Sequence, residues 1–414
     1  MSDAPRSGPR QFRWYLGGHA AWFTSFGIQM ILFPWLVAVV LQESAQRVGI
    51  AQMTVMAPAI VFMLYGGAVA DRADCRGLLL RYQILAAVPP LALVAVMAAG
   101  ALSYRALLVY GFAMGTPTAF VVPARDTLLS RVVRHGRERA IAITSGAQFI
   151  CQLVGIAVAG FAERIGALAL LLSQAVILVL GAFAVSRLAP APPAAVPRHG
   201  ESPLGAMRDG LRAVLRSDRL FPVVMAMLAV GIFYGGVFSV ILPLMVRDIF
   251  GGGSAELALV NTCFWGGTIA STLFQIRRGA LRRPGRAVLL SLAWGSIVLV
   301  AMSVPGPLSV FALICLGWGV GAGVVLTQGR IIVQLETPES HRARALAVFQ
   351  LGFTGGSPIG ALGMGYLAGQ VGPRSAVLYP AAAMAVVLTV LFRRSGLWGH
   401  TATSAMSTPI SSAA

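Results

Sequence analysis

Long apolar runs alternate with short polar connections along almost the whole chain. Each run has roughly the 20 residues that a helix needs to cross the hydrocarbon core of a bilayer. Grouping the apolar residues between charged positions predicts twelve membrane-spanning helices. They cover Trp14–Leu41, Val48–Ala70, Leu78–Leu102, Ala106–Val122, Ala140–Ala162, Ala167–Val185, Phe221–Val246, Leu257–Ile276, Val288–Val304, Leu308–Val333, Ala345–Ala368 and Ala376–Phe392.

The first six spans and the last six resemble each other in sequence. A shift of 205 positions places Arg125 on Arg330 and Gly155 on Gly360, although composition bias alone would produce some such matches. Repeated halves that flank a cavity at mid-membrane are the architecture of alternating-access carriers. The same shift pairs Arg137 with Arg342, Arg139 with Arg344 and Gly160 with Gly365.

The expected fold is therefore an all-α polytopic membrane protein with twelve transmembrane helices in two pseudo-symmetric six-helix bundles. A tail rich in Ser, Thr and Ala follows the last span, and such a composition predicts disorder. The expected boundaries are 1–13 for the N-terminal tail, 14–187 for the first bundle, 188–219 for a linker, 220–394 for the second bundle and 395–414 for the C-terminal tail.

The linker contains a segment, Leu204–Arg216, whose apolar residues recur at helical spacing. Arg208, Arg212 and Arg216 recur every four residues on a second stripe. This pattern predicts an amphipathic helix on the anionic cytoplasmic leaflet. A solvated linker without such a helix fits the same residues equally well.

Composition excludes an ordinary soluble protein and a nucleic-acid binder. Of the 414 residues, 57% are hydrophobic and only 11% are charged, about half of the charged share of a soluble domain. The mean hydropathy is +0.79. The net charge of +18 comes from arginines in the short connections, which is the pattern that sets membrane topology rather than a nucleic-acid footprint.

The arginines also predict the orientation of the chain. An even number of spans puts both termini on one side, and with that side in the cytoplasm only five arginines face outward. The other 27 of the 32 then face the cytoplasm, as the positive-inside rule requires. We expect a multi-pass protein of the bacterial inner membrane with both termini cytoplasmic. The five outward arginines are Arg47, Arg105, Arg164, Arg247 and Arg374.

The sequence offers no motif for an enzyme, a cofactor or a metal. There is no Ser/His/Asp set, no HExxH and no glycine-rich phosphate loop, the motifs that such chemistry would need. The four cysteines have no CxxC pairing and no histidine at metal-ligand spacing, so we interpret them as apolar packing residues. They are Cys75, Cys151, Cys263 and Cys315.

The segment Gly66–Arg76, at the exit of the second span, resembles the loop between helices two and three of the major facilitator superfamily (MFS). Gly67, Asp71, Arg72 and Arg76 fall on the positions of that family's pattern. The resemblance implies a cytoplasmic latch that holds the outward-open state of the transport cycle. An interfacial loop that merely follows charge bias is the alternative. Charged residues at the cytoplasmic ends of other spans complete the expected latch, namely Arg125, Asp126, Arg342 and Arg344.

Three short patches resemble one branch of this superfamily, which contains macrolide-efflux and enterobactin-exporter proteins. They are Pro123–Leu129, Thr24–Gly27 and Ala57–Pro58. The resemblance implies export of a drug, a siderophore or another metabolite, with proton antiport as one route of coupling. The branch often places an acid directly after the glycine of the first span, but Gly27 is followed by Ile28.

Charged groups within the predicted spans are scarce, although such groups commonly carry coupling ions. All fourteen acids lie in tails, in connections or at span ends, and His19 is the only histidine within a span. A neutral imidazole titrates near neutral pH, so His19 is the candidate proton carrier. A packing role at the membrane interface is the alternative.

Uncharged polar and aromatic residues near the span centres are the candidates for a substrate cavity. Buried amides seek a partner or a wet cavity, whereas Trp and Tyr supply flat apolar walls with one polar atom. Each also fits a role in helix packing, but together they predict a large amphipathic pocket without charge. They are Gln29, Gln148, Gln152, Tyr234, Asn261, Trp265, Trp318 and Gln350.

We therefore expect a secondary active transporter that exports an amphiphilic small molecule by alternating access. Its expected partners are that substrate, the lipid bilayer and, in the case of antiport, a proton; we expect a monomer and no nucleic acid. An importer, a lysolipid flippase on the same scaffold and a membrane sensor that does not transport are the alternatives.

Overall fold

The computed structural model describes residues 9–72, 74–133, 137–189, 212, 217, 220–279, 281–337 and 339–399 of the chain. Within these residues every regular element is a helix, and eleven helical spans are long and apolar enough to cross a membrane. The elements are α1 (Pro9–Trp35), η1 (Leu36–Val40), α2 (Ala45–Arg72), α3 (Cys75–Ala98), α4 (Tyr104–Val132), α5 (Arg137–Ala159), α6 (Ala162–Ile165), α7 (Ala167–Ser186), α9 (Leu220–Ala229), η2 (Val230–Gly235), η3 (Val237–Ile241), α10 (Leu242–Asp248), α11 (Ser254–Arg278), α12 (Pro284–Ser303), α13 (Leu308–Glu336), α14 (Glu339–Val371), α15 (Pro373–Ala376), α16 (Leu378–Arg394) and η4 (Gly396–Gly399).

These helices occupy the spans predicted from the apolar runs, which confirms the all-α polytopic fold. The second predicted span corresponds to α2, which has 28 residues; the side chains of its residues 63–72 lie outside the described part. The predicted amphipathic segment Leu204–Arg216 also lies outside the described residues, apart from Arg212.

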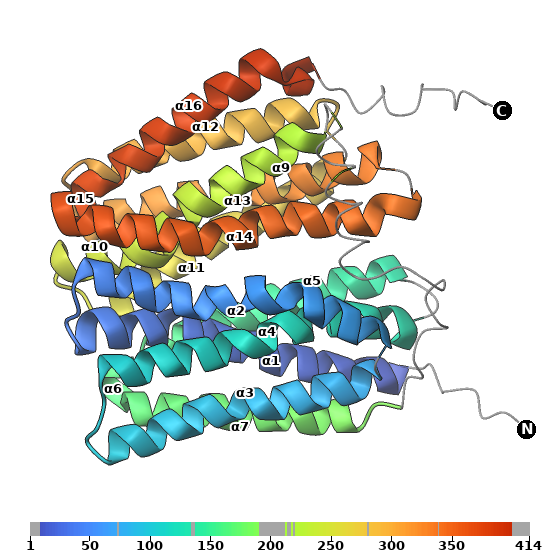
Figure 1. Ribbon diagram of the computed structural model, residues 1–414, viewed down its shortest axis with the longest axis vertical. Helices are drawn as coiled ribbons and strands as arrows, with labels where there is room; N and C mark the ends of the chain where they lie inside the picture. Colours follow the sequence, from blue (N-terminus) through green and yellow to red (C-terminus); the bar gives the residue numbers. More distant parts are fainter. Residues whose placement is uncertain are drawn as a thin grey trace, which may run out of the picture. The chain divides into compact units, whose positions relative to one another are not determined.

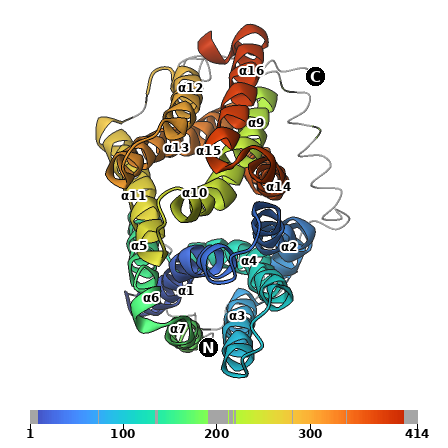
Figure 2. The same ribbon diagram turned by 90° about the vertical axis from the view of Figure 1, so that its left-hand side faces the viewer.

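By their contacts, the described residues among 1–203 and 242–262 form a first compact unit. Within it α1 packs against α5 and α7, and α3 packs against α4 and α7, while α2 lies along α4 (Figures 1 and 2). The apolar faces of α1, α3, α4 and α7 meet in a core that includes Tyr15, Trp22, Phe23, Leu79, Leu128 and Leu178.

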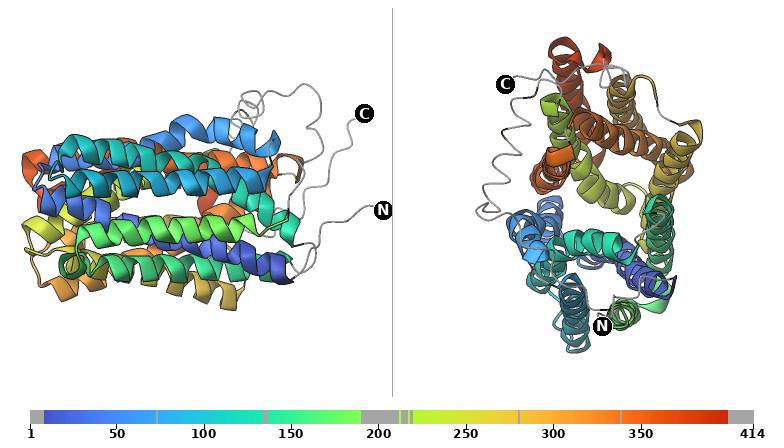
Figure 3. Two further views of the ribbon diagram at one scale, coloured as in Figure 1. Left: turned by 90° about the horizontal axis from the view of Figure 1, so that it is seen from below. Right: turned by 90° about the vertical axis from the view of Figure 1, so that its right-hand side faces the viewer.

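The described residues among 204–241 and 263–414 form a second compact unit. Within it α12 packs against α13 and α16, and α14 packs against α9 and η2; Figure 3 shows these helices from two further sides. The boundary between the units falls inside the continuous helix α11, between Thr262 and Cys263. The domain boundaries expected from the sequence stay a prediction.

Glycines let two helix pairs approach each other backbone to backbone. In the first unit, a Cβ on Gly155 would lie 3.0 Å from the Cα of Gly27 and would overlap the carbonyl of Thr24. In the second unit, a Cβ on Gly231 would lie 3.1 Å from the Cα of Gly356. Small residues permit this close packing of membrane helices. Because the pairs join spans one and five and spans seven and eleven, the sequence repeat has a counterpart in the packing.

Spans one and seven contain π-helical turns next to a proline. In span one, η1 begins two residues after Pro34. In span seven, η2 and η3 precede Pro243, which lies in α10. Proline has no N–H and disturbs the regular helical ladder, and a π-turn absorbs one extra residue. π-Turns occur frequently at functional sites, so spans one and seven are candidates for the location of such a site.

Candidate functional site

Most side chains of the expected cytoplasmic latch lie outside the described part of the chain. The latch therefore stays a prediction, and only Arg76 and Arg125 of its members can be placed. The members that cannot be placed are Gly67, Asp71, Arg72, Asp126, Arg342 and Arg344.

Arg76 joins the start of α3 to the end of α7. Its Nη2 donates a hydrogen bond of 2.5 Å to the carbonyl oxygen of Ser186, the last residue of α7. Asp74 caps α3, because its carboxylate accepts hydrogen bonds of 3.1 Å from the backbone N–H groups of Arg76 and Gly77. A cation thus lies at a helix C-terminus and an anion at a helix N-terminus, the favourable arrangement for both helix dipoles.

Arg125 anchors α4 to α1. It is buried, and its guanidinium carbon lies 4.5 Å from the ring centroid of Phe23. The hydroxyl of Tyr15 donates a hydrogen bond of 3.3 Å to the carbonyl oxygen of Arg125. A cation and the face of an aromatic ring attract each other, and more strongly where water is excluded. This contact therefore stabilises the packing of α4 on α1.

His19 is buried between two aromatic rings of α1. Its ring lies 5.9 Å from that of Tyr15 and 4.8 Å from that of Phe23, measured between centroids. Its Nε2 forms a hydrogen bond of 3.0 Å with the carbonyl oxygen of Thr144 in α5. The histidine predicted to carry a proton therefore connects α1 to α5, and its role in coupling stays a prediction.

Gln29 belongs to a buried polar cluster of three side chains, Gln29, Tyr110 and Gln174, which come from α1, α4 and α7. The Tyr110 hydroxyl lies 2.5 Å from Oε1 of Gln29 and 3.2 Å from Oε1 of Gln174. Nε2 of Gln174 donates to Oε1 of Gln29 at 3.3 Å and to the carbonyl of Ser25 at 3.2 Å. Within the described residues, Nε2 of Gln29 has no hydrogen-bond partner.

The other amides predicted for the cavity do not gather at one place. Gln152 is buried and donates a hydrogen bond to the sulfur of Met30 at 3.3 Å. Asn261 is buried too, but it bonds at 2.8 Å to a carbonyl one turn earlier in its own helix. Gln148 is partly buried and Gln350 is exposed. The first unit therefore brings only Gln29 of the predicted amides into a network with other polar side chains.

The second unit brings the predicted aromatic residues together. Rings of span seven, α11 and α13 form an aromatic cluster of five residues with centroids 4.7–6.4 Å apart. Aromatic pairs at such separations attract each other beyond the effect of their buried area. The members are Tyr234, Phe238, Phe264, Trp265 and Trp318.

The cluster has a buried centre and two partly exposed members. Trp318 is 3% exposed, whereas Phe238 and Trp265 retain intermediate exposure. Tyr234 is fixed by its hydroxyl, which donates to the carbonyl of Leu292 at 2.6 Å. Phe238 lies in η3, and Tyr234 lies in η2, so the π-helical part of span seven supplies two of the five rings.

Sequence reasoning missed four members of these two clusters. Gln174 is an amide within an apolar span, so the rule that selected Gln29 would also have found it. Tyr110 lies in the second turn of α4, away from the span centre, so a search of the span centres passes over it. Phe238 and Phe264 could not have been found either, because a phenylalanine that faces lipid and one in a cluster look alike in a sequence.

The described residues contain no group of three or more His, Cys, Asp or Glu side chains that could hold a metal ion. All four cysteines belong to the described part of the chain and none of them forms a disulfide; Cys75 and Cys315 are buried.

Comparison with solved structures shows the fold. The nucleoside transporter NupG matches with a TM-score of 0.74 at 12% identity, covering 97% of this chain and 100% of that one. A bacterial homologue of the human lysosomal transporter Spinster matches with a TM-score of 0.69 at 13% identity, covering 98% and 99%. A D-xylose–proton symporter matches with a TM-score of 0.69 at 13% identity, covering 94% and 98%.

Comparison at the sequence level shows the family. No curated protein sequence matches the chain. A family model of the MFS, described as transmembrane secretion effector, matches residues 12–408, almost the whole chain. The protein therefore belongs to the transmembrane secretion effector family, and it is a multi-pass membrane protein with the transporter fold of the MFS.

Proposed function

We propose that the protein exports an uncharged amphiphilic small molecule across the bacterial inner membrane by alternating access. A drug, a siderophore or another metabolite with a flat apolar part and a few oxygen atoms would fit. The family description, transmembrane secretion effector, supports the outward direction. The positive-inside bias supports cytoplasmic termini.

The aromatic cluster carries this proposal. Five rings from three elements offer stacking faces, and Phe238 and Trp265 keep part of their surface exposed. Binding sites for small molecules are commonly lined by aromatic side chains with a few polar groups. Since the cluster contains no cationic side chain and the faces of its rings carry partial negative charge, it favours a neutral apolar group over an anion.

The polar cluster of the first unit supports a substrate with oxygen atoms. Nε2 of the buried Gln29 can donate a hydrogen bond that no described residue accepts. A buried donor without an acceptor costs free energy, and a carbonyl or hydroxyl oxygen of a substrate would satisfy it. Carboxylates and arginines are absent from this cluster as well, so it also favours an uncharged ligand.

The proposal is tested with inside-out membrane vesicles from cells that express the protein and from cells that do not. A panel of neutral aromatic amphiphiles is offered together with neutral sugars and small anions. Export predicts energy-dependent accumulation of an aromatic amphiphile inside these vesicles. Accumulation only in right-side-out vesicles would indicate import, and transport restricted to sugars or anions would contradict the proposed substrate class.

Two tryptophans provide a matched pair of variants for this assay. Trp265 belongs to the aromatic cluster, whereas Trp294 of α12 lies outside it, 45% exposed, with its Nε1 bonded to the carbonyl of Gly317 at 2.7 Å. We expect Trp265→Ala to raise KM about tenfold, which corresponds to about 1.4 kcal/mol. We expect Trp294→Ala to leave KM within about twofold. Equal effects in both variants would remove the aromatic cluster from the binding site.

A further inference from the structure

The connection between spans seven and eight packs with a part of the chain far away in sequence. Residues 242–262 belong by their contacts to the first unit, although the residues on either side of them belong to the second. The segment comprises α10, the turn that follows it and the first turns of α11. Two charged side chains, Arg247 and Glu163, form hydrogen bonds between this segment and the rest of the first unit, one at each end of the turn.

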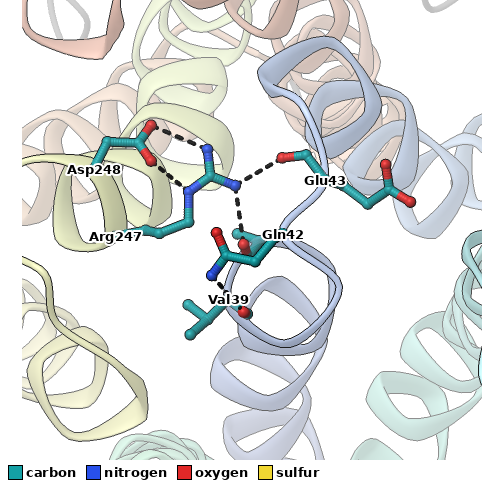
Figure 4. Close-up of polar contacts among 6 residues, drawn as sticks. Val39, Gln42, Glu43, Arg247 and Asp248 are labelled. Atoms are coloured by element: carbon teal, nitrogen blue, oxygen red, sulfur yellow. Dashed lines mark hydrogen bonds and ion pairs between the residues drawn. The ribbon is translucent and has the colours of Figure 1, made fainter.

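Arg247 binds the C-terminal end of span one. Its Nη1 donates hydrogen bonds of 2.9 Å to the carbonyl of Ala38, in η1, and of 2.7 Å to the carbonyl of Glu43 (Figure 4). Carbonyls at a helix C-terminus lack partners within the helix and carry partial negative charge. Nη2 of Arg247 bonds to the carboxylate of Asp248 at 3.1 Å, and this second contact fixes the orientation of the guanidinium.

Glu163 binds the N-terminal end of α11. Its Oε1, which comes from the short helix α6, accepts a hydrogen bond of 3.0 Å from the backbone N–H of Ser254. The Ser254 hydroxyl returns a hydrogen bond of 3.1 Å to the carbonyl of Gly160. Gly253 has no room for a side chain, because a Cβ there would overlap the Glu163 carboxylate. A carboxylate at a helix N-terminus is favourable for the helix dipole.

The two contacts are complementary. A cation of the connecting segment binds a helix C-terminus of the first unit, and an anion of the first unit binds a helix N-terminus of the connecting segment. With cytoplasmic termini, as proposed above, both contacts lie at the outer ends of the helices. We propose that Arg247 and Glu163 form an outer latch, which holds residues 242–262 on the first unit and must break when the outer side opens. The outer latch does not depend on the proposed substrate or direction of transport.

The same region supplies control residues of the same charge whose side-chain hydrogen bonds do not link the connecting segment to the rest of the first unit. Glu256 accepts a hydrogen bond of 2.7 Å from the N–H of Gly253, one residue from the Glu163 contact, but it belongs to α11 itself. Arg47 bonds to Glu43 at 2.9 Å, four residues away in the chain. This hydrogen bond raises the pKa of the Arg47 guanidinium. Neither residue joins the connecting segment to the rest of the first unit through these bonds.

The test measures how fast a maleimide labels a cysteine buried between the connecting segment and the rest of the first unit. Ala258, in α11, is 6% exposed. It packs against Gly160 of the first unit, since a Cβ added to Gly160 would lie 2.8 Å from the Cβ of Ala258. Ala258→Cys is introduced into a chain whose four native cysteines are replaced by alanine. Labelling of the purified protein in detergent reaches both faces, so the result depends neither on membrane orientation nor on a substrate. Elution from a sizing column checks that each variant remains folded.

We expect Glu163→Ala and Arg247→Ala each to speed up labelling of the cysteine introduced at position 258 about tenfold, because hydrogen bonds to charged groups are stronger than those between neutral groups. Glu256→Ala and Arg47→Ala should stay within about twofold of the parent. If the first two variants also stay within twofold, or if the controls match them, the outer latch is wrong.

A glycine variant tests the same contact from the other side. Gly253→Ala should speed up labelling as much as Glu163→Ala, because its Cβ would displace the carboxylate. In the Glu163→Ala background, Gly253→Ala should add less than twofold, since nothing remains to be displaced. Additive effects of the two changes would mean that Gly253 acts through the backbone, and they would contradict the proposed contact with Glu163.

Discussion

His19 and Thr144 fix the tautomer of the one histidine predicted to carry a proton. The Nε2 atom of His19 lies 3.0 Å from the carbonyl oxygen of Thr144. A carbonyl can only accept a hydrogen bond, so Nε2 carries the proton of the neutral ring. Nδ1 is then the basic atom, and within the described residues it has no hydrogen-bond partner. Any uptake of a proton by His19 takes place at Nδ1.

The first prediction concerns this atom. In His19→Gln the amide can still donate to the Thr144 carbonyl, but it cannot take up a proton. If His19 couples transport to protons, this variant flattens the dependence of the transport rate on pH, because the amide has no group that gains or loses a proton. The measurement is substrate flux in vesicles at several values of pH. A profile that matches the parent would assign His19 to packing between Tyr15 and Phe23.

The second prediction concerns the contact of α1 with α5. Gly155→Ala would push a Cβ into the carbonyl of Thr24, and overpacking of this kind costs about 1–3 kcal/mol. We expect a lower melting temperature in detergent. Gly146→Ala in the same helix is the control, because nothing lies within 4 Å of the added Cβ. Equal melting temperatures for both variants would show that the two helices can separate at no cost.

The third prediction concerns the polar cluster. Tyr110→Phe removes the hydroxyl whose hydrogen bonds reach Gln29 and Gln174. Hydrogen bonds between membrane helices contribute about 0.6 kcal/mol on average and rarely more than about 1.7. We therefore expect a loss of stability of about 1 kcal/mol in thermal or denaturant unfolding. An unchanged midpoint would mean that the two amides re-pair without the tyrosine.

The fourth prediction concerns the expected cytoplasmic latch. Asp71→Asn removes the charge that the family pattern places there, while the amide keeps the shape of the side chain. We expect transport to fall while the amount of protein inserted in the membrane stays the same. Vesicle flux is normalised to protein detected by immunoblot. Flux at the parental rate would exclude a role for Asp71 in this latch.

The sequence was sufficient to predict the helices. Membrane helices must satisfy their backbone hydrogen bonds internally, so an apolar run of sufficient length has few alternatives. The aromatic cluster was predictable in part, since Trp265 and Trp318 are large and rare within spans. Its phenylalanines were not, because the face that a phenylalanine presents depends on packing.

The outer latch was not predictable from the sequence either. The sequence predicts Arg247 in the connection between two spans, whereas it lies in the last turn of α10; an arginine at the end of a span has many possible partners. Its long-range partners are backbone carbonyls about 200 positions away. Because every residue has a backbone carbonyl, the sequence does not distinguish these two from any others. Glu163 was one of several acids at span ends, and its contact depends on the missing side chain of Gly253.

The π-helical turns of span seven have a consequence for any scan of that span. A helical wheel assumes that each residue turns the next side chain by about 100°, but a π-turn holds one residue more than the wheel allows. Positions before Val230 and positions after Ile241 therefore cannot share one wheel. Residue-by-residue accessibility along the span should show two periodic stretches that are out of phase, and deleting one residue between them should bring the stretches closer to a common phase.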